Sequence, residues 1–426
     1  MEQLTELGMR AREAAFALNG LTTEEKNRAL MASAAALEAH AEEIIRANRT
    51  DIENGRAKNM PEGLLDRLLL NEERIHGMAE AVRGVASLPD PVGDVLEEWT
   101  RPNGLRLRKV RVPIGVVGII YEARPNVTSD AFSIAFKSGN AVILKGGSDA
   151  IHSNSAVADV IRGALRENGF PEDALLLIRA TDHETTTKFM QMNGYVDVLI
   201  PRGSARLIQA VVKNSTVPVI ETGAGNCHIF LDEGCDTEMA KEIIFNAKTQ
   251  RIGVCNAAES LVVHRSVLGT VLPAAVKKLQ EKNVIVYADA EAFAALQEAA
   301  GADPELNRSL IERASEEDFG TEYLDYKMSV KTVGSVEEAI GHINRYSTKH
   351  SETILTPDEA HARLFQNAVD SACVYWNAST RFTDGGEFGF GAEIGISTAK
   401  LHARGPMGLR ELTTTKYQID GTGQVR

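Results

Sequence analysis

Cys255 is the residue whose type and setting most favour covalent chemistry in this sequence. It lies in the stretch QRIGVCNAAE (250–259), after a helical pattern and just before the apolar run SLVVH (260–264). A loop at this place can present a thiolate, the reactive form of cysteine, together with backbone N–H groups that stabilise an oxyanion. Gly253 allows a close backbone approach, and Arg251 is expected to lower the pKa of the thiol. On its local sequence alone, Cys255 is equally consistent with a small buried hydrophobic residue.

A carboxylate in a second stretch is also suited to chemistry. In VIETGAGNCHIF (219–230), Glu221 stands at the end of an expected strand and before Gly223 and Gly225. Ligands bind α/β sheets at the carboxyl ends of the strands, so this carboxylate can lean into a cleft. A surface acid in a turn is the competing interpretation.

A third stretch, LIPRGSARLIQ (199–209), suggests an anion site. Gly203 and Ser204 end one expected strand and open a helix. The N-terminus of a helix binds phosphate through its free N–H groups and the positive end of its dipole. The motif is not a full G-x-G-x-x-G, so an ordinary capped turn is the alternative.

The elements that must position these residues follow an α/β pattern. Residues 1–90 are mostly helical, and residues 98–112 form two extended arms around Asn103-Gly104, which is a hairpin signal. Short apolar runs then alternate with helical periods, which indicates parallel sheets covered on both faces. The expected strands are 115–120, 141–145, 175–180, 196–201 and 217–222, then, in a second unit from about residue 228, 260–264, 284–288, 328–333, 352–356 and 373–377, and finally an extended tail at 409–420.

Composition excludes several classes of protein. The 426 residues are 43% hydrophobic and carry a formal net charge of −13, so the chain can bury large cores and is a poor partner for nucleic acid. The N-terminus is charged, and the longest apolar run, 114–120, is too short to span a bilayer. The other cysteines, Cys227, Cys235 and Cys373, form no zinc-like spacing with Cys255. We expect no metal, no membrane and a reducing cytoplasmic location.

Taken together, the segments around Ser204, Glu221 and Cys255 resemble the aldehyde dehydrogenase superfamily. In that superfamily the glutamate precedes the nucleophilic cysteine by 34 residues, the spacing also found here. The resemblance implies an α/β fold with two Rossmann-like α/β/α domains and a small β flap for oligomerisation. The implied domains are a cofactor-binding domain at 1–225 with the hairpin 96–112, a catalytic domain at 226–385, and a return to the cofactor domain with an oligomerisation strand at 386–426.

The chain is more similar still to one branch of that superfamily, whose members reduce L-glutamyl 5-phosphate. The segments that carry this similarity are YEARPNVTSDA (121–131), LKGGSDA (144–150), IPRGSARLI (200–208), QRIGVCNAAE (250–259), HINRYSTKHSETI (342–354) and FGFGAEIGISTAKLHARGPMGL (388–409). The similarity implies NADPH-dependent reduction to L-glutamate 5-semialdehyde through a cysteinyl thioester, with release of phosphate, in proline biosynthesis. An oxidising or acyl-CoA-dependent enzyme of the same fold is the alternative.

The same resemblance implies partners. We expect a homodimer or a dimer of dimers, as the hairpin and the tail resemble the superfamily's oligomerisation strands. No kinase pattern precedes the dehydrogenase pattern, so we expect the glutamate 5-kinase that makes the acyl phosphate to be a separate polypeptide. The acyl phosphate is labile, which favours direct transfer through a transient contact, but the sequence leaves open whether the two proteins touch.

The resemblance assigns catalytic roles to three residues. Cys255 becomes the nucleophile, since a thioester accepts hydride far better than an oxygen ester. Asn126, in YEARPN where the superfamily has PWN, is the expected side-chain donor to the oxyanion, with Arg124 as the alternative occupant of that place. Glu221 is expected to move a proton at the thiol, because a reductase needs no hydrolytic water.

The resemblance also indicates the cofactor. The turn Lys145-Gly146-Gly147-Ser148 matches the superfamily's K-P-S-E, which holds the adenine ribose. Ser148 replaces an acid that would repel a 2′-phosphate and Lys145 attracts one, so we expect NADP(H) in spite of the neighbouring Asp149. The expected cofactor-binding residues are Lys145, Gly147, Ser148, Gly203, Ser204 and, at the nicotinamide ribose, Glu322 or Asp325.

The substrate carries an amino acid end and a phosphate, so its pocket needs cationic donors. The expected substrate-binding residues are Arg124, Arg251, Arg381, Arg404 and His350. A solvated surface position is the competing interpretation for each arginine.

Overall fold

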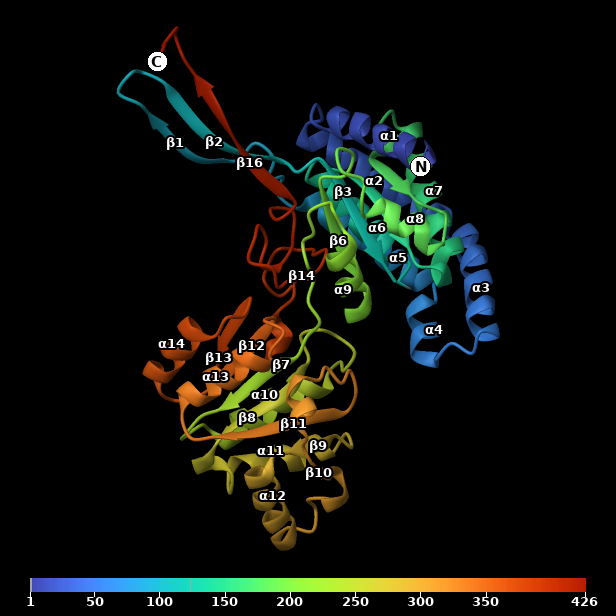
Figure 1. The fold of residues 1–426 in the computed structure, drawn as a ribbon. Coiled ribbons are helices and arrows are strands. Elements are labelled where there is room, and N and C mark those ends of the chain that lie inside the picture. The colour runs from blue at the N-terminus through green and yellow to red at the C-terminus, as the bar shows by residue number, and fades with distance from the viewer. Residues whose placement is uncertain (1, 123) are drawn as a thin grey trace. The chain divides into compact units, whose positions relative to one another are not determined.

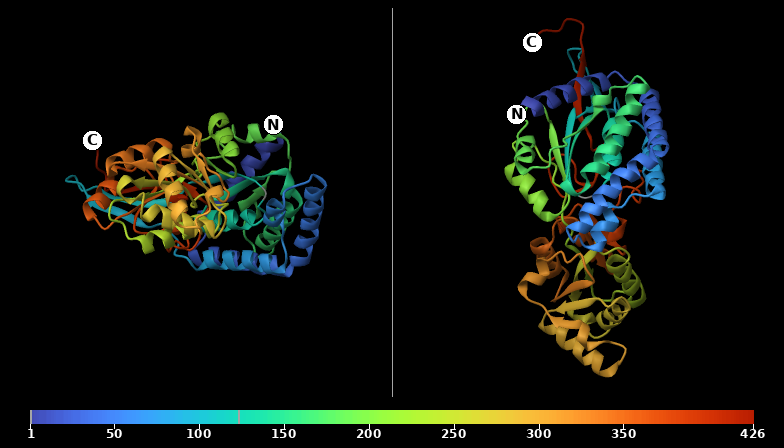
Figure 2. Two further views of the ribbon diagram at one scale, coloured as in Figure 1. Left: turned by 90° about the horizontal axis from the view of Figure 1, so that it is seen from below. Right: turned by 90° about the vertical axis from the view of Figure 1, so that its right-hand side faces the viewer.

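The protein consists of two compact units in the computed structural model, which describes residues 2–122 and 124–426. The first unit comprises Met1–Thr222, Gly389–Gly395 and Leu401–Arg426, and the second comprises Gly223–Phe388 and Ile396–Lys400. Figure 1 traces the chain through both units, and Figure 2 gives two further views.

The first unit begins with a helical layer, as the sequence predicts. Its helices are α1 (Glu2–Leu18), α2 (Thr23–Ala39), α3 (Ala41–Ala57), α4 (Glu62–Leu68) and α5 (Glu72–Ser87). The predicted capping box at the start of α2 is present, because the Thr22 side chain accepts from the Glu25 N–H and the Glu25 carboxylate accepts from the Thr22 N–H. Helix α2 packs against α5 and α7, and α3 packs against α7.

A four-stranded parallel sheet forms the core of the first unit, in the order β5-β4-β3-β6. The elements are β3 (Val116–Tyr121), α6 (Val127–Lys137), β4 (Ala141–Gly146), α7 (Ile151–Glu167), β5 (Leu175–Leu177), α8 (His183–Phe189), β6 (Val198–Arg202) and α9 (Ala205–Asn214). Strands β3 and β4 are buried along their whole length, which explains their continuous apolar sequences. The strand order reverses between β3 and β6, and ligands bind α/β sheets at such a point.

A separate antiparallel sheet also belongs to the first unit. Strands β1 (Val95–Thr100) and β2 (Arg106–Pro113) form the predicted hairpin, and β16 (Thr413–Asp420) pairs with β2 over its full length. The loop spans five residues rather than the two of a tight turn, since the Arg101 N–H donates to the Leu105 carbonyl. Gly104 supplies the positive φ of +87° that this loop requires.

The second unit is built on a seven-stranded parallel sheet in the order β10-β9-β11-β8-β7-β12-β13. Its elements are β7 (Cys227–Leu231), α10 (Thr237–Thr249), β8 (Ala258–His264), α11 (Val271–Gln280), β9 (Ile285–Ala288), α12 (Ala290–Ala302), β10 (Ile311–Arg313), β11 (Lys327–Val333), α13 (Val336–Tyr346), β12 (Ser351–Leu355), α14 (Glu359–Ala368) and β13 (Cys373–Trp376). Two apolar clusters pack against the faces of this sheet.

The short elements complete the fold. They are the 3₁₀ turns η1 (Ser148–Ala150), η2 (Glu172–Ala174), η3 (Arg265–Val267), η4 (Arg308–Leu310), η5 (Glu316–Gly320) and η6 (Thr380–Phe382), and the strands β14 (Ile396–Ser397) and β15 (Gly405–Pro406). Among the described helices, none combines the length and apolarity needed to cross a bilayer.

The prediction of a full strand at 217–222 was wrong. This segment touches the sheet through one parallel bridge between Leu199 and Val219. Pro218 cannot donate a hydrogen bond to a ladder, which is one reason that the pairing stops there. Strand β7 was not among the predicted strands, although its residues are all buried.

Candidate active site

Cys255 lies in the turn that joins α10 to β8, and its side chain is half-buried. This turn touches the segment that precedes β7. A Cβ atom placed on Gly225 would lie 1.5 Å from the carbonyl oxygen of Cys255, so only a glycine fits there. The Cys227 thiol donates to the same carbonyl oxygen across 3.2 Å. The backbone at Cys255 is therefore fixed by the start of the neighbouring strand.

Glu322 reaches the same place from the segment before β11. Its carboxylate accepts a hydrogen bond from the Gly225 N–H at 2.6 Å, so it lies beside the glycine that contacts Cys255. Asp325 instead accepts from the Tyr326 N–H at 2.8 Å and pairs with Lys327, and the backbone hydrogen bond holds its pKa below the ordinary value. Of these two acids, Glu322 is the one connected to the cysteine turn.

A buried ion pair braces both sides of the cysteine turn. Lys248, near the end of α10, donates to the Glu259 carboxylate in β8, and both side chains are fully buried. Glu259 also accepts from the Leu324 N–H at 3.3 Å. Burial raises the pKa of Glu259 to about 7 and lowers the pKa of Lys248. Sequence reasoning missed this pair, whose signal was two charged residues next to apolar runs.

His350 lies inside the second unit, with its side chain facing Cys227. Its Nδ1 atom is 3.8 Å from the Cys227 Sγ atom and 2.8 Å from the Ser351 hydroxyl oxygen. Ser351 continues the network to the Thr383 hydroxyl at 2.6 Å. Burial raises the pKa of the Cys227 thiol, which suits a hydrogen-bond donor rather than a nucleophile. His350 therefore supports the turn that carries Cys255, and its fully buried side chain is not exposed for a ligand.

In the first unit, the end of β4 and the turn after it contain three predicted cofactor residues, Lys145, Gly147 and Ser148. Lys145 is buried, its ammonium donates to the Gly146 carbonyl at 3.1 Å, and burial lowers its pKa. Ser148 is exposed at the start of η1. Asp149, the acid that weighs against a 2′-phosphate, is paired with Lys58 at 3.2 Å. Its charge is therefore balanced within the protein.

The predicted anion site at Gly203 and Ser204 already contains a carboxylate. Glu122, which directly follows β3, accepts from the Ser204 N–H at 2.7 Å and from the Ser204 hydroxyl at 3.0 Å. A Cβ atom on Gly203 would lie 2.6 Å from this carboxylate. The pair lies at the N-terminus of α9, between the ends of β3 and β6 where the strand order reverses. The donors here therefore fit an anionic group such as a cofactor phosphate.

The remaining predicted residues of the first unit lie at or near ends of its strands. Asn126 donates to the Asp130 carboxylate at 2.9 Å, and burial raises the pKa of Asp130 to about 6. Arg124 and Arg404 are exposed, and Glu221 is half-buried beside Thr222. The predicted residues thus divide between the units. Asn126, Arg124, Lys145, Gly147, Ser148, Gly203, Ser204, Glu221 and Arg404 lie in the first, and Arg251, Cys255, Glu322, His350 and Arg381 lie in the second.

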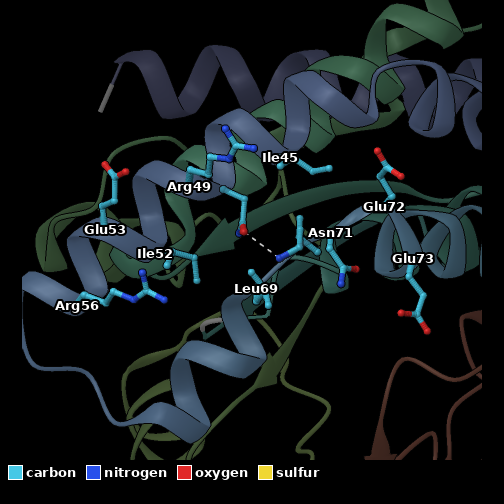
Figure 3. A pocket seen from close by; sticks show the side chains of 11 residues that line it. Ile45, Arg49, Ile52, Glu53, Arg56, Leu69, Asn71, Glu72 and Glu73 are labelled. Atoms are coloured by element: carbon cyan, nitrogen blue, oxygen red, sulfur yellow. Dashed lines mark hydrogen bonds between the residues drawn. The ribbon is translucent and has the colours of Figure 1, made fainter.

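A surface depression of about 620 Å³ in the first unit contains none of these residues. It lies between α3 and the start of α5, and its lining includes Ile52 and Leu69. Figure 3 shows arginines of α3 on one side and Glu72 and Glu73 on the other.

The chain has two α/β units and a cysteine in the turn after α10. Residues 2–319 match the Aldehyde dehydrogenase family, which gives the class of the protein. The chain is 56% identical to the gamma-glutamyl phosphate reductase of Lachnospira eligens over 426 residues, which cover 100% of both proteins. It is 55% identical to the protein of the same name from Heliobacterium modesticaldum, covering 100% of this chain and 99% of that protein. The crystal structure of the Thermotoga maritima gamma-glutamyl phosphate reductase has 48% identity and a TM-score of 0.95, with 99% of each chain covered.

The chain therefore belongs to the gamma-glutamyl phosphate reductases of the aldehyde dehydrogenase family. This confirms the resemblance and the fold class predicted from the sequence.

Proposed function

We propose that this protein reduces L-glutamyl 5-phosphate to L-glutamate 5-semialdehyde with NADPH and releases phosphate. The observation that carries the proposal is the fixed turn of Cys255, held by Gly225 and Cys227, in a chain whose full-length relatives bear that reductase name. The second unit then carries the nucleophile and the first unit holds the cofactor. A phosphate-releasing reductase of this kind serves proline biosynthesis in a reducing cytoplasm.

The chemistry begins at Cys255. Its thiolate attacks the acyl carbon, the C–O bond to phosphate breaks, and phosphate leaves with the bonding electron pair. When bound, the reduced nicotinamide supplies hydride to the carbonyl carbon of the thioester. The C–S bond then breaks, which restores the thiolate and frees the aldehyde. Backbone N–H groups at the cysteine turn and the Asn126 amide stabilise the oxyanion in both stages.

We assign the cofactor to the turn Lys145–Ser148 and to the N-terminus of α9. This assignment is supported by the N–H and hydroxyl of Ser204, which already donate to the carboxylate of Glu122 and so can bind an anion. NADP(H) is preferred because Ser148 is uncharged and Asp149 is paired with Lys58. Glu322 is the better candidate for the nicotinamide ribose, since it lies beside the cysteine turn.

Cationic side chains bind the two anionic ends of the substrate. Arg251 and Arg381 belong to the unit of Cys255, and Arg124 and Arg404 belong to the other unit. Glu221 moves a proton at the thiol. The acyl phosphate must be supplied by a phosphoryl-transfer reaction, because a free carboxylate is not activated for attack by a thiolate.

The deciding experiment runs the reaction backwards. Glutamate 5-semialdehyde and NADP⁺ should give NADPH only when inorganic phosphate is present, and coenzyme A should not replace phosphate. Cys255→Ala should abolish turnover while NADPH binding stays near normal. Phosphate-independent oxidation, or substantial activity in Cys255→Ala, would contradict the proposal.

A further inference from the structure

The residue after the nucleophile, Asn256, is anchored by one short turn of the second unit. Its side chain is 4% exposed, and its amide donates to the carbonyls of Thr383 at 2.9 Å and of Arg381 at 3.3 Å. Its backbone carbonyl accepts from the Thr380 hydroxyl at 2.7 Å. This chain of contacts joins the cysteine turn to η6, which lies 125 residues further along the sequence.

Asn256 also holds a cation. The Arg381 guanidinium donates from Nη1 to the Asn256 side-chain oxygen and from Nε to the Gln250 side-chain oxygen at 2.9 Å. Gln250 and Asn256 stand on either side of Cys255 in the chain. The guanidinium is therefore fixed by two residues of the turn that carries the nucleophile.

The fixed guanidinium donates to the side chain of the residue next to Cys255, so its charge lies where it can act on the cysteine. It is half-buried, and its pKa is lowered by burial and by the neighbouring charge of Arg251, while Asp384 and Cys255 favour its charged form. Since the interaction is mutual, the positive charge of Arg381 favours the Cys255 thiolate. An arginine without these hydrogen bonds would occupy many rotamers, so its charge would spend less time near Cys255.

Several other titratable or charged groups face the cysteine turn. They are Arg251 on the turn itself, Cys227 and His350 beneath it, Glu322 beside Gly225, the buried pair Lys248–Glu259, and Asp384 after η6. Most are held by partners of their own. Arg381 differs because the side-chain oxygens of Gln250 and Asn256, to which its guanidinium donates, belong to neutral amides that bring no compensating charge.

We propose that Asn256 is a positioning residue that fixes the Arg381 guanidinium beside Cys255 and thereby stabilises the thiolate. The proposal rests on the role of Cys255 as nucleophile given above. It differs from a purely structural role, in which Asn256 would only hold the loop together.

The test measures the thiolate directly, without substrate or cofactor. The full-length protein is alkylated with iodoacetamide across a pH series, and modification of Cys255 is followed by peptide mass spectrometry. Asn256→Ala should move the midpoint of the pH profile upward by about one unit, which lowers the alkylation rate near neutral pH about tenfold. kcat should fall by a similar factor, while the Kd for NADPH stays unchanged.

The matched control is Asn48→Ala. Asn48 is equally buried and makes similar hydrogen bonds, donating to the Leu68 carbonyl at 2.8 Å and the Ser153 hydroxyl at 3.0 Å, but it lies in the first unit. It should cost stability without moving the pH profile of Cys255. A loss of stability in Asn256→Ala with an unmoved midpoint would overturn the proposal.

A second set of variants keeps the test valid if Asn256→Ala does not fold. Arg381→Met should raise the midpoint by at least as much, and Gln250→Ala, which removes the other anchor, should raise it by less. In the Arg381→Met background, Gln250→Ala should add nothing. An equal shift in both backgrounds would show that the anchors do not act through Arg381. Failure of the proposed function would be seen separately, as turnover that survives in Cys255→Ala.

Discussion

At the scale of single residues, the shape of the cysteine turn depends on a glycine, Gly225, which has no side chain. Gly225 has no Cβ, and this lets the carbonyl of Cys255 occupy the space where a Cβ would be. That carbonyl then receives the Cys227 thiol, and the Gly225 N–H remains available to Glu322. One glycine therefore connects the turn of Cys255, the proposed nucleophile, to Glu322, the acid that we propose for the ribose.

Gly225→Ala is expected to remove most activity. The new methyl group would sit 1.5 Å from the Cys255 carbonyl oxygen, so the turn has to move away. We expect kcat to fall by at least about a hundredfold, since misplacement of reacting groups by 1 Å costs about that factor. Steady-state kinetics and thermal unfolding measure the two effects. Gly341→Ala is the control, because an added Cβ there meets no atom within 4 Å, and comparable losses in both variants would refute the explanation.

Glu122→Gln is expected to tighten the binding of NADP(H). The Glu122 carboxylate occupies the donors of Ser204, so a phosphate that binds there must displace a negative charge. Replacing it with a neutral amide weakens that competitor by roughly 1 kcal/mol, or about fivefold in Kd. Titration of NADPH fluorescence at two salt concentrations measures the gain, which should shrink as salt rises.

The control for this change is Glu25→Gln. Glu25 likewise accepts a backbone N–H at a helix start, from Thr22 at 2.8 Å, but it belongs to α2. Its Kd for NADPH should equal that of the wild type. If Glu122→Gln binds NADPH no better than wild type, the donors of Ser204 are not where the cofactor phosphate binds.

At the scale of elements, the Lys248–Glu259 pair ties α10 to β8 and makes stability depend on pH. Burial raises the pKa of Glu259 to about 7, above the ordinary value of 4.5. Between these two values the folded state keeps a proton that the unfolded state releases, so the free energy of unfolding falls as pH rises. The contribution is fully present below pH 4.5 and is lost by about pH 7, for a change of about 3 kcal/mol.

Glu259→Gln should flatten this dependence. Urea unfolding at pH 5 and pH 7.5 measures it, with Trp376 of β13 as the reporter for the second unit and Trp99→Phe as the background. The background protein should lose stability between the two pH values, and the Glu259→Gln variant should lose clearly less. At pH 5 the variant should be close to the background in stability, because the protonated carboxyl of Glu259 is as uncharged as the amide that replaces it. Equal slopes would count against a raised pKa at Glu259.

The three-stranded sheet is the element that we assign to oligomerisation. Strand β16 is exposed from Thr414 onward, and Tyr417 and Ile419 each keep 56% of their surface in contact with solvent. Tyr417 packs edge-on against Trp99 of β1 with ring centroids 6.0 Å apart. Strands with exposed apolar side chains and free edges are suited to pairing with a partner.

If this sheet forms the expected dimer, a chain that ends at Leu412 should be monomeric. The cut removes β16 but keeps the hydrogen bond from Asn140 to the Leu412 carbonyl, so the core of the first unit is preserved. Light scattering should give the monomer mass, and circular dichroism should show a folded chain. A chain that ends at Asp420 is the control and should keep the assembly of the full chain. If the chain that ends at Leu412 keeps the mass of the full-length assembly, oligomerisation uses another surface.

Much of this element structure could be predicted, because buried parallel strands have continuous apolar sequences and the hairpin has its Asn-Gly signal. Strand β7 was missed because Cys227 and His228 interrupt its apolar run, and their burial depends on partners in other strands. The Lys248–Glu259 pair was missed for the same reason. A charged residue is predicted to be exposed unless its partner is known, because charged side chains are rarely buried without one.

At the scale of the whole molecule, sequence reasoning reached the fold and singled out Cys255, but it did not reach the contacts that fix the turn of Cys255. The predicted cysteine and Glu322 do meet through Gly225. The anchoring of Asn256 by η6 joins residues 125 positions apart, and no local pattern encodes such a contact. The first unit likewise depends on a contact between distant residues. Its last strand, β16, returns to pair with β2 only after the chain has passed through the whole second unit.

That return determines when the molecule can be completed during synthesis. Strand β2 leaves the ribosome about 300 residues before β16, its partner, and the intervening chain contains all of the second unit. The nascent second unit can fold while β2 still has an unpaired edge. At the usual synthesis rate of roughly 5–20 residues per second, that edge stays open for about 15 to 60 seconds. An exposed strand edge is prone to aggregation for as long as it is unpaired, so this interval is when we expect the newborn chain to depend most on chaperones.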